Sequence, residues 1–107
     1  MPVDNLETID IVSTAEDGST VLIISDHLDW RDGDHLLTLQ KKLNLYLRFI
    51  ESGELFQRYP GAQGKKVGIE VVMLCEPDET AVEFLKRAGA IIEGAGFRFG
   101  YRRRPLT

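Results

Sequence analysis

The segment Val67–Cys75 constrains the fold more than any other part of this sequence. Its first half alternates between apolar positions and glycine or glutamate, but Val71–Cys75 is apolar at every position. A strand that is apolar on both sides must be covered on both sides, as the central strands of α/β sheets are. The sequence therefore predicts a central strand at residues 67–75, with helices against at least one of its faces.

Two shorter β-rich segments precede this strand, at about residues 8–15 and 19–25. Asp17 and Gly18 lie between them. Asp-Gly is a strong hairpin signal, because the tight turns that connect antiparallel strands need residues that tolerate a positive φ. We therefore predict a β-hairpin at this end of the chain.

Two segments carry the three- and four-residue spacing of apolar side chains that is typical of amphipathic helices. The first covers residues 36–59, where Gly53 is expected to weaken the helix without necessarily ending it and Pro60 to stop it. The second runs from a predicted cap at Asp78 to about Ile92. Two aspartates are candidates for the cap of the first helix, Asp32 and Asp34.

Residues 97–102 alternate aromatic side chains with arginine or glycine, which predicts a fourth strand with one aromatic face. The element order is then β-β-α-β-α-β. We predict one α+β domain over residues 1–107, a four-stranded mixed sheet with two helices packed on one face. This arrangement buries the apolar stripe of each helix and allows right-handed crossovers. The pattern leaves the strand order open.

The sheet face that the helices leave open needs a cover of its own. Apolar residues occur in both phases of the second strand, so this face is predicted to hold Leu22 and Ile24, or Val21 and Ile23, together with Val72 and Leu74. A contiguous apolar patch of this kind is typical of a partner surface. We therefore expect a homodimer, formed through this face or through an exposed edge strand.

The densest polar cluster lies between the second strand and the first helix, around Trp30. It contains Asp26, His27, Asp29, Asp32, Asp34 and His35. Ligands often bind at the carboxyl ends of strands in α/β sheets. Imidazole and carboxylate groups there could hold a small molecule or a divalent metal, or perform acid–base chemistry, and the candidates are Asp26, His27, Asp29 and His35.

A structural explanation of the same cluster competes with this one. Aspartates gather at helix starts as caps, and the eight-residue spacing of the two histidines matches no zinc signature. Trp30 is expected to pack over the edge of the core, as large aromatic side chains at element boundaries do.

Other possible sites carry weaker signals. Cys75 is flanked by Glu76, which disfavours a reactive thiolate, so we expect an inert core or interface thiol. The segment Gly61–Lys66 precedes a strand and lacks the spacing of a phosphate-binding loop, which favours a polar connector. The sequence implies no cofactor and no catalytic residue.

The charges are divided unequally along the chain. Residues 1–35 hold nine acids and one arginine, whereas residues 36–107 hold eight acids and twelve bases. Arginines interleaved with aromatic residues near the C-terminus suit single-stranded nucleic acid: Arg98, Arg102, Arg103 and Arg104. Against this stands a sequence pI of about 5.1. Pairing of these arginines with the acidic first third is the simpler explanation, so nucleic acid is not the expected partner.

Composition also limits the setting in which the chain works. The single cysteine allows no internal disulfide, so a cytoplasmic location is expected. The sequence has no run of 18 or more apolar residues and begins with an acidic segment, so neither a membrane span nor a secretory signal is expected.

Two segments carry a family resemblance: Ile24–Trp30, which contains SDHLDW, and His35–Glu54, which contains YLRFIESG. They resemble a family of small uncharacterised bacterial single-domain proteins, and the similarity continues through Tyr59-Pro60 into Phe84-Leu85. The resemblance implies no catalytic residues. The leading hypothesis is a cytoplasmic protein-interaction or self-associating module, and the alternative is the ligand or metal site in the Asp/His cluster.

Overall fold

The computed structural model describes residues 11–31 and 33–103 and contains four strands and three α-helices in this part of the chain. The strands are β1 (Ile11–Thr14), β2 (Thr20–Asp26), β3 (Val67–Met73) and β4 (Arg98–Arg103). The helices are α1 (His35–Glu51), α2 (Glu54–Arg58) and α3 (Glu79–Gly94), with a short 3₁₀ turn η1 (Pro60–Ala62). Residues 8–10, which the sequence assigns to the first strand, lie outside the described residues.

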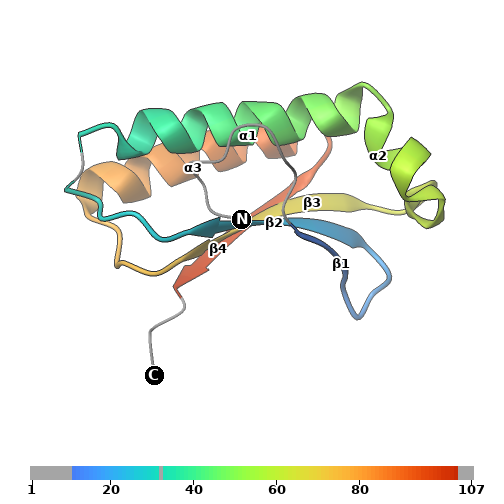
Figure 1. The fold of residues 1–107 in the computed structure, drawn as a ribbon, viewed down its shortest axis with the longest axis horizontal. Coiled ribbons are helices and arrows are strands. Elements are labelled where there is room, and N and C mark those ends of the chain that lie inside the picture. The colour runs from blue at the N-terminus through green and yellow to red at the C-terminus, as the bar shows by residue number, and fades with distance from the viewer. Residues whose placement is uncertain (1–10, 32, 104–107) are drawn as a thin grey trace.

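The strands form one mixed sheet in the order β1-β2-β3-β4. β1 pairs with β2 in antiparallel fashion, whereas β2 pairs with β3 and β3 with β4 in parallel. Both long helices, α1 and α3, cover the same face of the sheet (Figure 1). The predicted α+β class and the four-stranded mixed sheet are therefore confirmed.

The expectation of one helix over residues 36–59 is wrong. The chain leaves α1 at Glu51 and passes through Gly53, whose φ of 85° lies in the left-handed region. Glycine adopts this conformation without the steric cost that a Cβ imposes. The break redirects the chain so that α2 packs the fully buried Leu55 against the core, giving three helices where two were predicted.

The two helix starts differ in how they are capped. The Asp78 carboxylate accepts a hydrogen bond of 2.8 Å from the backbone N–H of Ala81, as the sequence predicts. Asp34 occupies the N-cap position of α1, but its side chain makes no capping hydrogen bond. Asp32 lies outside the described residues.

The core lies between the helices and the two central strands. Leu22 and Ile24 of β2 are fully buried within it. Strand alternation then places Val21 and Ile23 on the opposite, open face, which they share with Val72 and Leu74. Of the two alternatives for this face, the one with Leu22 and Ile24 is excluded, because both side chains belong to the core.

No helix within the described ranges is both long and apolar enough to cross a membrane.

The break at Gly53 can be tested by substitution. Gly53→Ala is expected to lower the free energy of unfolding by about 1 kcal/mol, because alanine is strained at this positive φ. Gly94→Ala is the control, since a Cβ at that helical position meets no atom within 4 Å. It should leave stability unchanged or raise it, because alanine is the better helix former. Equal effects of the two changes in urea denaturation would contradict this account of the break.

Candidate functional site

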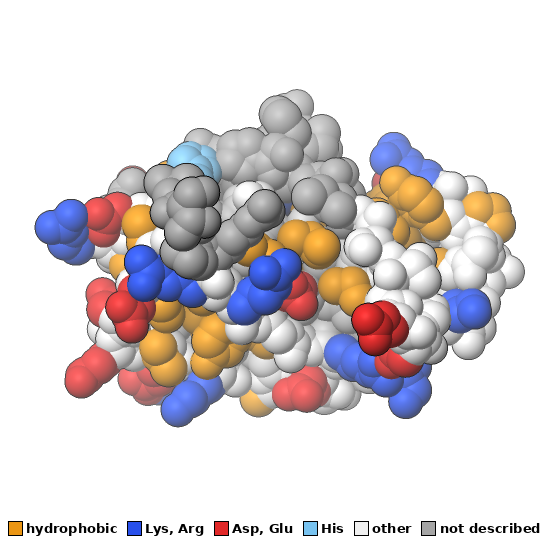
Figure 2. Space-filling model, turned by 90° about the horizontal axis from the view of Figure 1, so that it is seen from below, with side chains coloured by type: hydrophobic (Ala, Val, Ile, Leu, Met, Phe, Trp, Pro, Cys, Tyr) orange, Lys and Arg blue, Asp and Glu red, His pale blue; other side chains and the backbone are white. Residues whose placement is uncertain are grey.

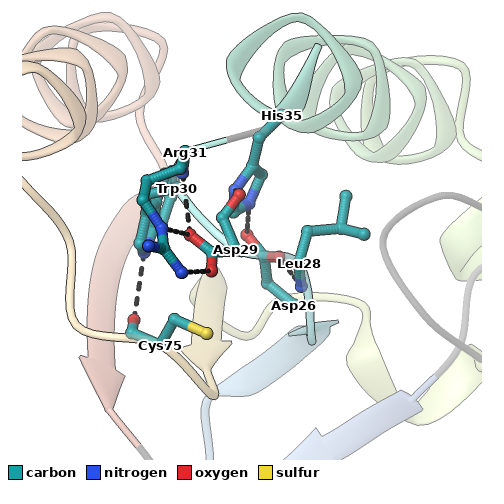
Figure 3. Close-up of polar contacts among 7 residues, drawn as sticks. All are labelled: Asp26, Leu28, Asp29, Trp30, Arg31, His35 and Cys75. Atoms are coloured by element: carbon teal, nitrogen blue, oxygen red, sulfur yellow. Dashed lines mark hydrogen bonds and ion pairs between the residues drawn. The ribbon is translucent and has the colours of Figure 1, made fainter. Parts of the chain in front are cut away.

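The predicted ligand cluster lies where β2 ends and α1 begins. Asp26 is the last residue of β2 and His35 the first residue of α1, and their side chains are fully buried. The intervening loop brings its own backbone and Trp30 around these two side chains (Figure 3). The cluster is therefore fixed by the ends of two regular elements.

Asp26 and His35 form a short hydrogen-bonded pair. Nε2 of His35 lies 2.6 Å from Oδ2 of Asp26. The second oxygen of Asp26 accepts from the backbone N–H of Leu28 at 3.1 Å. Nδ1 of His35 lies 3.0 Å from the carbonyl oxygen of Asp29, and a carbonyl can only accept, so Nδ1 carries a hydrogen. Every polar side-chain atom of the pair therefore has a partner within the protein.

Trp30 closes the cluster on one side. Its ring stacks on the imidazole of His35, with ring centroids 3.8 Å apart and an interplanar angle of 17°. Its indole N–H donates to the carbonyl oxygen of Cys75 at 3.0 Å, just beyond the end of β3. Trp30 thus joins the β2–α1 loop to the chain that follows β3, and it packs at the core edge as predicted.

The Asp29 side chain turns away from the buried pair and binds Arg31. Nη2 of Arg31 lies 2.8 Å from one carboxylate oxygen of Asp29, and Nε lies 3.2 Å from the other. These side-chain bonds, together with the backbone N–H of Arg31 at 2.8 Å, lower the pKa of Asp29 to about 2. The same carboxylate raises the pKa of the Arg31 guanidinium. Asp29 is therefore an ionised, solvent-facing group that is already paired.

Of the four candidate ligands, the structure brings two side chains together, Asp26 and His35. His27 is exposed, and the Asp29 side chain is half exposed. Across residues 11–31 and 33–103, no three His, Cys, Asp or Glu side chains gather in a group that could hold a metal ion. A catalytic acid or base must reach its substrate, which a fully buried and satisfied pair does not. This geometry favours a structural role for Asp26 and His35.

A second polar region lies on the open face of the sheet, where the sequence suggested only an apolar patch. Arg98 binds Asp17 at 2.7 Å, and Arg102 binds Glu70 at 2.7 Å. The pKa of Asp17 is held well below its usual range, first by hydrogen bonds from Ser19 and then by Arg98. Figure 2 views this face and shows acidic and basic side chains beside one another, with hydrophobic side chains between them.

The same face has a hollow of about 400 Å³ over the start of β3 and β4. Its lining includes Asp17, Gly68, Glu70, Arg98 and Gly100. We call it the Gly100 hollow. Strand alternation indicates only part of it, namely that Gly68 and Glu70 in β3, and Arg98 and Gly100 in β4, each lie on one face of their own strand. The parallel β3–β4 register that makes them neighbours was not readable from the sequence.

The ion pairs bear on the nucleic-acid hypothesis. Arg98 pairs with Asp17 of the acidic first third, as predicted from the charge distribution, but Arg102 pairs with Glu70 and Arg103 with Glu76, at 3.7 Å. Each described arginine of this cluster therefore has an acidic neighbour.

Comparison with known proteins places the chain in a family. The model of a family of unknown function, DUF6572, matches residues 1–104. No curated protein and no solved structure matches the chain.

The buried pair can be tested with a double-mutant cycle. Asp26→Ala and His35→Ala are each expected to lower the free energy of unfolding by about 3 kcal/mol, because each leaves a buried polar partner unsatisfied. The double variant should lose much less than the sum of the two. Asp29→Ala is the control and should change stability little, since this carboxylate is exposed. Additive losses in urea denaturation would contradict a coupled pair.

The Asp29–Arg31 pair gives a separate prediction about pH. In Arg31→Ala, the pKa of Asp29 should rise from about 2 toward its ordinary value of 3.8, and it should stay below 3.8 because the backbone N–H still donates. Because folding lowers this pKa, the pair stabilises the fold above about pH 3.8, and its contribution is lost as the pH falls through about 2. Carboxyl chemical shifts measured by NMR across this range would report the change. An unaltered pKa in Arg31→Ala would refute the assignment.

Proposed function

The chain belongs to the DUF6572 family, and we propose that it works as a protein-binding module whose partner is a second copy of itself, held along the outer edge of β4. The proposal is supported by the position and exposure of that strand. A cytoplasmic location is part of the proposal, and the free thiol of Cys75 agrees with a reducing compartment.

The observation that carries the proposal is the unpaired edge of β4. This strand is last in the sheet order, and among the described residues only β3 pairs with it. Five of its six residues are exposed, and Tyr101 is one of the few large hydrophobic residues in the described chain with substantial exposure, 38%. A strand edge offers a row of backbone donors and acceptors that a second strand can pair with.

A second copy fits this edge through a two-fold axis perpendicular to the sheet. Such an axis runs the two β4 strands antiparallel and keeps the helices of both copies on the same side. Two four-stranded sheets then become one continuous sheet, and each copy contributes the same surface. Because the edge is only six residues long, the buried area is at the small end of specific interfaces, and we expect a Kd in the micromolar range.

The broad open face is a poorer candidate than the edge. Its apolar residues, Val21, Ile23, Val72 and Leu74, share the face with the Arg98–Asp17 and Arg102–Glu70 ion pairs. Burying these charges under a flat partner surface would cost desolvation energy. Pairing along β4 does not cover these ion pairs with a flat partner surface.

The alternative, a ligand or metal site in the Asp/His cluster, has less support. Asp26 and His35 have no exposed side-chain surface, and their polar atoms are already satisfied. We therefore assign the binding function to the edge of the sheet and not to this cluster.

The solution mass tests the proposal directly. Sedimentation equilibrium or light scattering should show a rise from 12.1 kDa toward twice that value as the concentration increases through the micromolar range. Tyr101→Glu should shift the equilibrium toward the monomer, because it places like charges at the edge. Ile91→Glu, on the exposed side of α3, is the matched control and should leave the dimer intact. A monomer at all concentrations, or a dimer broken by Ile91→Glu instead, would overturn the proposal.

A further inference from the structure

Nothing in the fold of a single chain requires a glycine at position 100 of β4. Gly100 lies in the middle of an edge strand, where glycine weakens β-structure. Two other glycines have reasons within the fold: a Cβ at Gly68 would lie 3.1 Å from Cβ of Arg98, and a Cβ at Gly89 would lie 3.0 Å from the Phe99 ring. A Cβ at Gly100 would meet no atom within 4 Å, and its φ is not positive. Glycine inside a strand also marks places where another chain approaches closely.

Gly100 lines the Gly100 hollow together with the carboxylate residue Glu70. Glu70 lies next to Gly100 in the β3–β4 register, so its side chain is one strand away on the same face. Glu70 is one-third exposed and binds the exposed Arg102 of its own chain. Gly100 has no side chain, and a Cβ there would meet no atom within 4 Å, so this residue places no side chain between the β4 edge and Glu70.

We infer that the Gly100 hollow is the binding site for the Arg102 guanidinium of a second copy. The inference rests on the proposed function, since it names the contact that fixes how two β4 edges pair. Antiparallel strands related by a perpendicular two-fold axis place residues of the same face opposite each other. Centring the axis on Tyr101 puts each Gly100 opposite Arg102 of the other copy, and Phe99 opposite Arg103.

This register differs from its nearest alternative in the residue that lies opposite Arg102. With the axis on Gly100, Arg98 of each copy would lie opposite Arg102 of the other, and like charges opposite one another are destabilising. With the axis on Tyr101, the two tyrosine rings face each other and each Arg102 extends over a glycine toward Glu70. Two strand spacings of about 4.8 Å separate the backbones of Glu70 and the incoming Arg102, a span that a glutamate and an arginine side chain bridge together.

Glu70 thus has two possible guanidinium partners, one in each copy. Within a single chain it binds its own Arg102 at 2.7 Å. In the pair of copies, both Glu70 carboxylates and both Arg102 side chains surround the axis, and each carboxylate can bind either arginine. The group that Glu70 binds in the Gly100 hollow is therefore a guanidinium that extends from a neighbouring strand.

Cysteine cross-linking tests the register, with Cys75→Ala as the background to remove the native thiol. Tyr101→Cys should form an intermolecular disulfide under mild oxidation, because opposite residues have Cα atoms about 5 Å apart. Gly100→Cys should not, because its counterpart lies diagonally, at about 7–8 Å. A disulfide from Gly100→Cys without one from Tyr101→Cys would overturn the inference. So would the absence of both in a protein that sedimentation shows to be dimeric.

Side-chain size at Gly100 tests the hollow. Gly100→Val should weaken the dimer about tenfold by blocking Arg102, while the melting temperature of the monomer at low concentration stays the same or rises. Glu70→Gln should also weaken the dimer, and Glu83→Gln, which removes an exposed ion pair on α3, is the control. A dimer unaffected by Gly100→Val would overturn the hollow as a binding site and leave self-association standing. The absence of any dimer in the wild-type chain would instead refute the proposed function.

Discussion

The buried hydrogen bond between Asp26 and His35 is the contact on which the arrangement of this fold depends. It joins the last residue of β2 to the first residue of α1, so it fixes where the first crossover leaves the sheet. Trp30 stacks on the imidazole and extends the connection to the end of β3 through the Cys75 carbonyl. Breaking one partner of a buried pair leaves the other unsatisfied, which is far more costly than losing an exposed ion pair. The cluster that most resembles a reaction site is therefore explained by the needs of the fold.

The surface that we propose for function is the β4 edge of the sheet. β4 is exposed, has one described neighbour, and carries arginines that Asp17, Glu70 and Glu76 neutralise. An edge covered with unpaired arginines would repel a second copy, and these ion pairs reduce that repulsion in the proposed dimer. In the described part of the chain, the arginines of β4 thus form local ion pairs with acidic residues that are distant in the sequence or in the neighbouring strand.

Much of the fold could be predicted from periodicity, because apolar spacing reports directly which faces are buried. The apolar segment 67–75 indicated a central strand, and Asp78 indicated a helix start, which its bond to Ala81 confirms. The break at Gly53 was missed, because the conformation of a glycine depends on how the chain after it packs. The spacing of apolar residues does not show that packing. For the candidate site, the sequence found Asp26 and His35 but could not show that they bind each other. Which residues share a face depends on register, and register is set by long-range pairing that no local pattern records.

Hydrogen exchange of the β4 amides, measured by mass spectrometry or NMR at increasing protein concentration, tests the central claim most directly. If two copies pair along this edge, the β4 amides that do not bond to β3 will exchange more slowly as the concentration rises, while the amides of the α1–α3 surface and of the β1 edge will not change. The account is contradicted if β4 exchange is independent of concentration, or if the concentration-dependent protection appears on the helices or on β1 instead.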